Sequence, residues 1–149
     1  GAKNVKESDF IDPNRGLLKF FLFLTDVNNK DGDLAYIKGS HKIGYAINKI
    51  IFDKKIEYKP FWSLKQIKNL ITKKTILNEL KNYVSNDEII NFQNSTDFIL
   101  KNDDTFIHNK LNKAGDLMIF DEHGVHRGSE PKTNTRYVIR FIYGKKSIY

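Results

Sequence analysis

The sequence contains no cysteine in 149 residues. That absence excludes disulfide bonds, thiolate-ligated zinc sites and cysteine nucleophiles, so histidine and the carboxylates are the side chains left for binding a metal. Long apolar runs are also missing, because the longest, LLKFFLFL, is too short to cross a bilayer and includes Lys19. No signal-peptide pattern opens the sequence. We expect a cytoplasmic protein without a membrane partner.

Arginine is scarce and does not cluster. It occurs only at positions 15, 127, 136 and 140, whereas lysines are spread along the whole chain and give it a net charge of +7. Nucleic-acid binding is better indicated by clustered arginines with interleaved aromatic residues. The many Asn and Ile residues favour a general bias in residue usage instead. We predict that nucleic acid is not a partner.

The length fits one domain over residues 1–149. The stretch GLLKFFLFLTDV, residues 16–27, is apolar on both faces and predicts a central strand buried on both sides. A turn cluster, NNKDGD, separates it from LAYIKGSHK, which predicts a second short strand ending in a Gly-Ser turn. Together the two segments predict a hairpin.

The pattern changes after the segment 45–60, which reads as strand or irregular structure. From 62 to 92 apolar residues recur at helical spacing, with Ser63 as the N-cap. Short strands then follow in DTFIHNKL, AGDLMIF, GVHRG and TRYVIRFIYG. The sequence therefore predicts a mainly β fold, a sandwich or barrel, with a helical insertion around residues 62–92.

Two residues near the end of the chain suggest a metal site with an oxoacid cosubstrate. His126 follows a glycine on a short predicted strand, and Arg136 begins the next strand ten residues later. In an antiparallel pair the two side chains would face the same interior. A histidine nitrogen binds a divalent metal, and a guanidinium group holds a carboxylate in bidentate fashion.

Two blocks of the sequence resemble the phytanoyl-CoA dioxygenase-like family. The first is LLKFFLFLTDVNNKDGDLAYIKGSHK, and the second is AGDLMIFDEHGVHRGSEPKTNTRYVIRFIY. They occur in the family's order. The resemblance implies a double-stranded β-helix of the jelly-roll, cupin-like type that binds Fe(II) and 2-oxoglutarate and hydroxylates a small-molecule substrate.

The family's site residues carry over onto particular positions of this chain. The resemblance implies that His126 is the distal metal ligand and that Arg136 grips 2-oxoglutarate. It places Ser129 and Lys19 as further cosubstrate contacts. The family's His-x-Asp motif precedes the aromatic strand, where Asp9 takes the aspartate position and Glu7 stands in place of the histidine.

No histidine occurs before His41, and a shift of one residue would place Lys6 and Ser8 at the motif instead. Glu7, Asp9 and His126 would form a one-histidine, two-carboxylate site able to hold Fe(II), Mn(II) or Mg(II). The alternative function is a catalytically impaired domain that binds a small anion or a partner protein. A cupin-like metal isomerase is a third hypothesis.

The other histidines are assigned to structural roles. We predict that His123 and His41 lie in turns, and that His108 is a strand residue and the reserve ligand. Family members are usually longer at the N-terminus, so the chain is expected to be a truncated or divergent member. Apolar surface left exposed by the missing length predicts a homo-oligomer.

Overall fold

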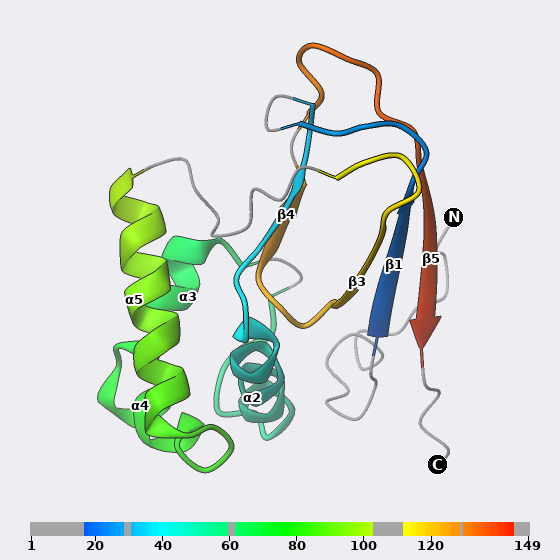
Figure 1. Ribbon diagram of the computed structural model, residues 1–149. Coiled ribbons are helices and arrows are strands. Elements are labelled where there is room, and N and C mark those ends of the chain that lie inside the picture. Colours follow the sequence, from blue (N-terminus) through cyan, green and yellow to red (C-terminus); the bar gives the residue numbers. More distant parts are fainter. Residues whose placement is uncertain (1–16, 29–30, 60–61, 103–111, 129, 145–149) are drawn as a thin grey trace.

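The computed structural model describes residues 17–28, 31–59, 62–102, 112–128 and 130–144. In these residues helices gather on one side, a two-stranded sheet lies in the middle and a three-stranded sheet lies on the other side (Figure 1). The strands are β1 (Leu17–Phe23), β2 (Leu34–Tyr36), β3 (Leu117–Asp121), β4 (His126–Gly128) and β5 (Val138–Gly144). The helices are α2 (Ser40–Phe52), α3 (Leu64–Ile71), α4 (Lys74–Leu80) and α5 (Asn86–Asn102).

The two sheets are antiparallel and separate. The larger has the strand order β3-β1-β5, and the smaller pairs β2 with β4. In the larger sheet Phe20 lies opposite Ile119 on one side and opposite Phe141 on the other. In the smaller sheet Tyr36 lies opposite His126. The chain thus alternates between the sheets, and strands that follow one another in sequence do not pair.

The predicted double-stranded β-helix is wrong. A jelly roll needs eight strands in two packed sheets, whereas the described residues form five strands in sheets of three and two, alongside four helices. The predicted hairpin is also wrong, because β1 and β2 belong to different sheets. The protein is a mixed α/β fold in which helices build much of the core.

The main apolar core lies among the helices and the end of β2. Fifteen buried side chains form one cluster, and apart from Ala35, Ile37 and Val84 they come from the four helices. The helical segment predicted over 62–92 is therefore confirmed as helical. It is not an insertion into a β fold, because the helices run from residue 40 to residue 102 and supply most of the core.

Helix α2 occupies a segment for which the sequence predicted a turn followed by strand or irregular structure. Its buried residues are Ile43, Ala46, Ile47, Ile50 and Ile51, with Ser40 in the first turn. Their spacing is that of one helix face. The prediction failed because isoleucine favours strands when it is judged residue by residue. Gly39, with φ 79°, allows the sharp turn from β2 into the helix.

Ser63 is confirmed as the N-cap of α3. Its hydroxyl accepts a hydrogen bond from the Gln66 amide (3.2 Å), and the Gln66 side chain accepts one from the Ser63 amide (2.9 Å). This reciprocal pair satisfies two amides that the first turn leaves open. We expect Ser63→Ala to lower the free energy of unfolding by about 1 kcal/mol. Urea denaturation checks this, and Ser63→Thr should retain most of the stability.

None of the helices in the described ranges is long and apolar enough to span a membrane.

Candidate functional site

The turn between β3 and β4 carries both histidines of the motif that the sequence singled out. We call residues 122–126 the histidine loop. The Gly124 amide donates to the Asp121 carbonyl (3.1 Å), which closes the turn, and the Tyr36 hydroxyl donates to the same carbonyl (3.2 Å). Burial, followed by the negative charge of Asp121, raises the pKa of Tyr36 to about 12. Tyr36 therefore remains a neutral donor that holds the loop in place.

His126 has one ring nitrogen fixed by the backbone. Its Nδ1 lies 2.7 Å from the Gly124 carbonyl oxygen. A carbonyl can only accept, so Nδ1 carries a proton and Nε2 is the ring nitrogen left to bind a metal. The ring also lies 5.3 Å from that of Phe120, centroid to centroid. Metal-binding histidines are commonly oriented in this way, by a hydrogen bond from the other ring nitrogen.

His123 is fixed similarly, but by a carboxylate. Its Nδ1 lies 2.8 Å from Oδ1 of Asp121, which also accepts the His123 amide (2.9 Å). The prediction that His123 lies in a turn is confirmed, and Asp121 bonds the amide of that residue. No role was predicted for the His123 ring, although a carboxylate–histidine pair two residues apart is visible in FDEH.

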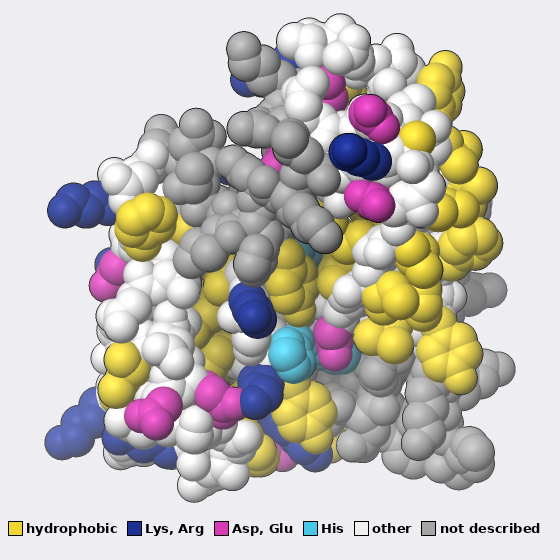
Figure 2. All heavy atoms as spheres, in the orientation of Figure 1, with side chains coloured by type: hydrophobic (Ala, Val, Ile, Leu, Met, Phe, Trp, Pro, Cys, Tyr) yellow, Lys and Arg dark blue, Asp and Glu magenta, His cyan; other side chains and the backbone are white. Residues whose placement is uncertain are grey.

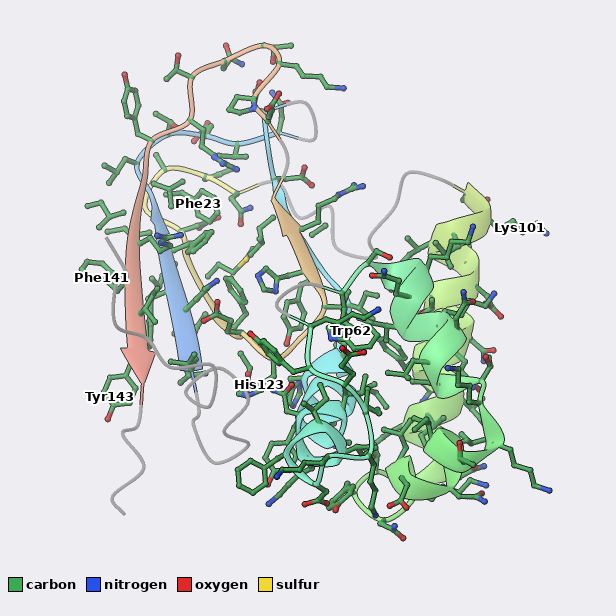
Figure 3. All side chains as sticks on the ribbon, turned by 180° about the vertical axis from the view of Figure 1, so that it is seen from behind. Phe23, Trp62, Lys101, His123, Phe141 and Tyr143 are labelled. Carbon is green, nitrogen blue, oxygen red and sulfur yellow. The ribbon has the colours of Figure 1, made fainter. Side chains whose placement is uncertain are left out.

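The histidine loop forms one wall of a cavity of about 390 Å³. A second wall comes from α2, through Ile43, Gly44 and Ile47. The lining of the cavity is completed by Trp62 and Ile67. Figure 3 shows Trp62 and His123 at this junction between the helices and the strands. The site thus combines two oriented imidazoles with an apolar lining supplied by helices. The wall formed by α2 was not predicted, because a turn followed by strand or irregular structure was expected for that segment.

Two glycines allow the close packing around the loop. A Cβ on Gly44 would lie 1.9 Å from the His123 carbonyl oxygen, and one on Gly124 would lie 1.9 Å from the Tyr36 hydroxyl. Neither separation is compatible with van der Waals contact. The absence of side chains at these positions therefore lets α2 and β2 approach the histidine loop from two directions.

Lys19 lies beside the same loop. Its Nζ lies 2.5 Å from Oε1 of Glu122, and its side chain is 13% exposed. The cosubstrate role of Lys19 stays a prediction. The observed contact is an ion pair with the one carboxylate among the described residues that line the cavity.

Arg136 does not face His126 across a strand pair, so that prediction is wrong. His126 lies on β4, whose partner is β2, while β5 pairs with β1. Arg136 itself is half-buried in the segment that leads into β5. The arginine and the histidine are therefore carried by different sheets.

The segment before Arg136 is fixed by Asp31, which the sequence analysis treated only as part of a turn cluster. The Asp31 carboxylate is 1% exposed and accepts four hydrogen bonds, all from Thr133 and Asn134. The shortest is from the Thr133 hydroxyl (2.5 Å). The hydrogen bond from the Thr133 hydroxyl is the largest influence on the Asp31 carboxyl and lowers its pKa. Burial raises the pKa, the Asn134 bonds lower it further, and the result is a pKa of about 2. We call this arrangement the Asp31 clamp.

Within the part of the chain that the structure describes, no three His, Asp or Glu side chains come together as a metal site. Those residues supply one ligand of the predicted set, His126, whose ring tautomer fits a first-row transition metal. Glu7, Asp9, Ser129 and the reserve ligand His108 lie outside the described residues.

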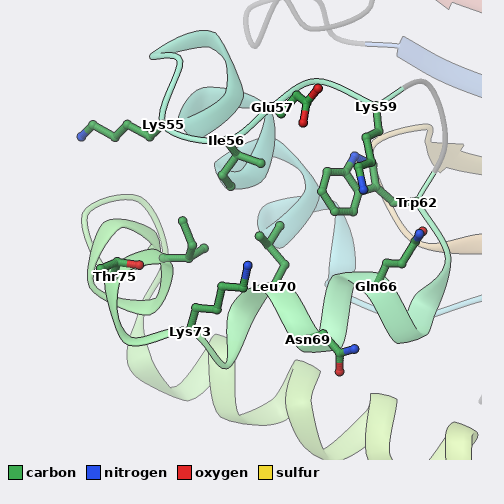
Figure 4. A pocket seen from close by; sticks show the side chains of 11 residues that line it. Lys55, Ile56, Glu57, Lys59, Trp62, Gln66, Asn69, Leu70, Lys73 and Thr75 are labelled. Atoms are coloured by element: carbon green, nitrogen blue, oxygen red, sulfur yellow. The ribbon is translucent and has the colours of Figure 1, made fainter.

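A second cavity, of about 490 Å³, lies on the far side of Trp62 (Figure 4). It is lined by Lys55, Lys59 and Lys73, with the Lys59 ammonium 5.2 Å from the Trp62 ring. Lys55 is paired with Glu79 at 2.8 Å, which raises its pKa. Exposed lysines are distributed over the whole chain, so this cavity is a weaker candidate than the histidine loop.

Comparison with protein-family models, curated proteins and solved structures finds no match to this chain. The family resemblance rests on the two sequence blocks alone.

Proposed function

We propose that the chain is an Fe(II)- and 2-oxoglutarate-dependent oxygenase of the phytanoyl-CoA dioxygenase-like type, with His126 as a metal ligand. The observation that carries the proposal is the orientation of the His126 ring. Its Nδ1 donates to the Gly124 carbonyl and Nε2 is left as the nitrogen with a free electron pair. Bound Fe(II) and 2-oxoglutarate would supply the oxidising chemistry, which no side chain of this cysteine-free sequence provides.

The described residues contribute binding and orientation in this proposal. His126 holds the metal, and Phe120 packs against its ring. Arg136, the cosubstrate arginine that the family resemblance implies, would have to reach the distal carboxylate from the segment before β5, on the other sheet from His126. The Asp31 clamp fixes the residues just before it. The apolar side chains of α2 and α3 along the cavity would limit the access of water. Glu7 and Asp9 would complete the ligand set.

A non-catalytic binding domain is the second candidate. It is favoured by the Lys19–Glu122 ion pair, because the carboxylate of this cavity is already neutralised by a lysine at 2.5 Å. A metal would have to compete with that ammonium group for Glu122.

Anaerobic calorimetric titration with Fe(II), and with Mn(II) as a stand-in, tests the proposal. We expect micromolar binding that strengthens when 2-oxoglutarate is present. His126→Ala should weaken metal binding by about 100-fold or more, because the loss of a ligand costs at least as much as the loss of a supporting hydrogen bond. His41→Ala is the matched control. It removes a half-exposed imidazole in the first turn of α2 that does not line the histidine-loop cavity, and should bind as the wild type does.

Arg136→Ala separates metal binding from cosubstrate binding. The variant should bind metal as the wild type does, but 2-oxoglutarate should no longer strengthen that binding. If neither metal binds the wild-type chain, or if His126→Ala and His41→Ala bind equally well, the oxygenase proposal fails. The non-catalytic alternative then becomes the better account. Near-ultraviolet circular dichroism of each variant shows that a lost signal does not reflect unfolding.

A further inference from the structure

The three-stranded sheet has one face that the described residues leave uncovered. Residues directly opposite one another in an antiparallel sheet share a face, so the register places Leu18, Phe20 and Leu22 of β1 on the same side as their partners. Those partners are Leu117, Ile119 and Asp121 on β3 and Ile139, Phe141 and Tyr143 on β5. We call this nine-residue surface the outer face.

The opposite face of the sheet is turned inward. Phe23 and Phe120 lie on it and are buried, and Phe120 contacts the rings of Phe21 and Tyr36. On the outer face, in contrast, Phe141 is 56% exposed and Tyr143 is 66% exposed. Figure 3 shows these two side chains pointing away from the helices, and Figure 2 shows hydrophobic side chains gathered on that side of the molecule.

The outer face is large and almost free of charge. Eight of its nine side chains are apolar, and it carries no lysine or arginine, although the chain has 25 of them. Three of the eight apolar side chains are aromatic, at roughly 150–250 Å² each, and the aliphatic ones are smaller. With these side chains on average somewhat less than half exposed, the patch measures on the order of 600 Å². This is at the upper end of the apolar patches that monomers expose and of the same order as the ~800 Å² per partner of a stable interface.

We propose that the outer face packs against the same face of a second copy of this chain, so that the two three-stranded sheets form a symmetric dimer. A second copy brings the same eight apolar side chains, as an isologous interface requires. The longest segment outside the described residues, 1–16, carries only half as many, namely Ala2, Val5, Phe10 and Ile11 besides a proline. Two copies with a charge of +7 each can also meet here without burying a cation.

The dimer would leave the candidate site accessible. His126 contacts Phe120, whose side chain is on the inward face of β3, so this part of the cavity lies on the other side of the sheet from the proposed interface. Asp121, at the end of β3, connects the outer face to the loop, because its carboxylate accepts the His123 amide. The dimer depends on the apolar side chains of the outer face and not on a bound metal, so metal binding and dimerisation can fail separately.

Sedimentation velocity and multi-angle light scattering over a range of concentrations test the proposal. We expect a species of twice the 17.4 kDa chain mass, with a dissociation constant in the micromolar range. Phe141→Lys places a cation within the interface, opposite Phe20 of the central strand, and should raise that constant by about 100-fold or more. Phe98→Lys is the matched control, because Phe98 is 51% exposed on α5, on the helical side of the molecule, and its replacement should leave the dimer intact.

Cross-linking through introduced cysteines tests the same interface if Phe141→Lys fails to fold. Because the chain has no native cysteine, Phe141→Cys and Phe98→Cys each provide a single thiol. A short bis-maleimide should cross-link two copies through position 141 and not through position 98. A monomer at concentrations of several hundred micromolar, an open series of larger aggregates, or equal cross-linking at both positions would overturn the proposal. A monomer would leave the outer face to a different partner.

Discussion

Replacing Gly44 with alanine is expected to destabilise the protein by about 2–3 kcal/mol. Gly44 lies within α2, where alanine would ordinarily add up to about 1 kcal/mol of helix stability. Packing reverses the sign, because the new Cβ would lie 1.9 Å from the His123 carbonyl oxygen and 2.9 Å from its carbonyl carbon. Both are backbone atoms, so no side-chain rotation relieves the clash, and either α2 or the histidine loop must move.

Urea denaturation measures the loss, and Gly128→Ala is the matched control. A Cβ on Gly128 would meet no atom within 4 Å, so this second glycine-to-alanine change should be close to neutral. If the α2 contact also holds the histidine loop, Gly44→Ala should weaken metal binding even at temperatures where the variant remains folded. A Gly44→Ala protein as stable as the wild type would show that α2 does not pack on this loop.

Local patterns of the sequence predicted several elements well. Ser63 and the apolar spacing that follows it identified α3, and the segments 117–121, 126–128 and 138–144 were each predicted as strand. These features depend on neighbours within a few residues, where capping chemistry and periodicity are strong signals.

Strand pairing was not predictable in the same way. The partners of β1 are about 100 residues later in the chain, and nothing local in GLLKFFLFLTDV excludes pairing with the next strand.

The dependence on distant partners also explains why β1 was wrongly predicted to be buried on both faces. A strand with apolar residues on both faces resembles one that is buried on both faces. The structure places β1 at the centre of its sheet, as predicted, but leaves Leu18 exposed and Phe20 and Leu22 only half-buried on the outer face. Sequence alone cannot distinguish burial within the fold from apolar surface that another chain would cover.

The candidate site has one feature that the sequence could have revealed and two that it could not. The Nδ1 contact of His126 is local, because its acceptor is two residues earlier, and a reading of the turn could have found it. The cavity wall formed by Ile43 and Ile47 could not be found, because the helix that carries them was missed. Asp31 was also missed as a structural residue, since its partners Thr133 and Asn134 lie 102 and 103 positions away.

Asp31→Asn is expected to lower the melting temperature by about 5–10 °C at neutral pH. The Asp31 carboxylate accepts four hydrogen bonds in a site that is 1% exposed. An asparagine would have only one acceptor oxygen and would turn its own NH₂ group toward donors of Thr133 or Asn134. A buried polar group left without its partner is costly. The control is Asp26→Asn, because Asp26 is exposed and accepts a single bond from the Ala114 amide (2.8 Å).

The pH dependence of that difference identifies the charge as its cause. The folded-state pKa of Asp31, about 2, is below the ordinary value of 3.8, so the unfolded chain takes up the proton first as the pH falls. The stabilisation from the carboxylate is therefore fully present above about pH 4 and is lost progressively between about pH 4 and pH 2. Lys42, together with Ser85, lowers the pKa of Glu88 from 4.5 to about 2, so the stability that Glu88 contributes is lost over a similar range, between about pH 4.5 and pH 2. Glu88 is present in both proteins, so its contribution cancels when Asp31→Asn is subtracted from the wild type.

Melting curves of wild type and Asp31→Asn should therefore converge as the pH is lowered toward 2. A gap that stays constant over this window would mean that Asp31 contributes through shape and not through charge.

The clamp also bears on the candidate site, because it holds Thr133 and Asn134 just ahead of Arg136. If Arg136 binds 2-oxoglutarate, Asp31→Asn should weaken the cosubstrate effect on metal binding while leaving binding of the metal alone to His126 unchanged. Equal loss of both would indicate general unfolding of the strands and not a local release of the arginine.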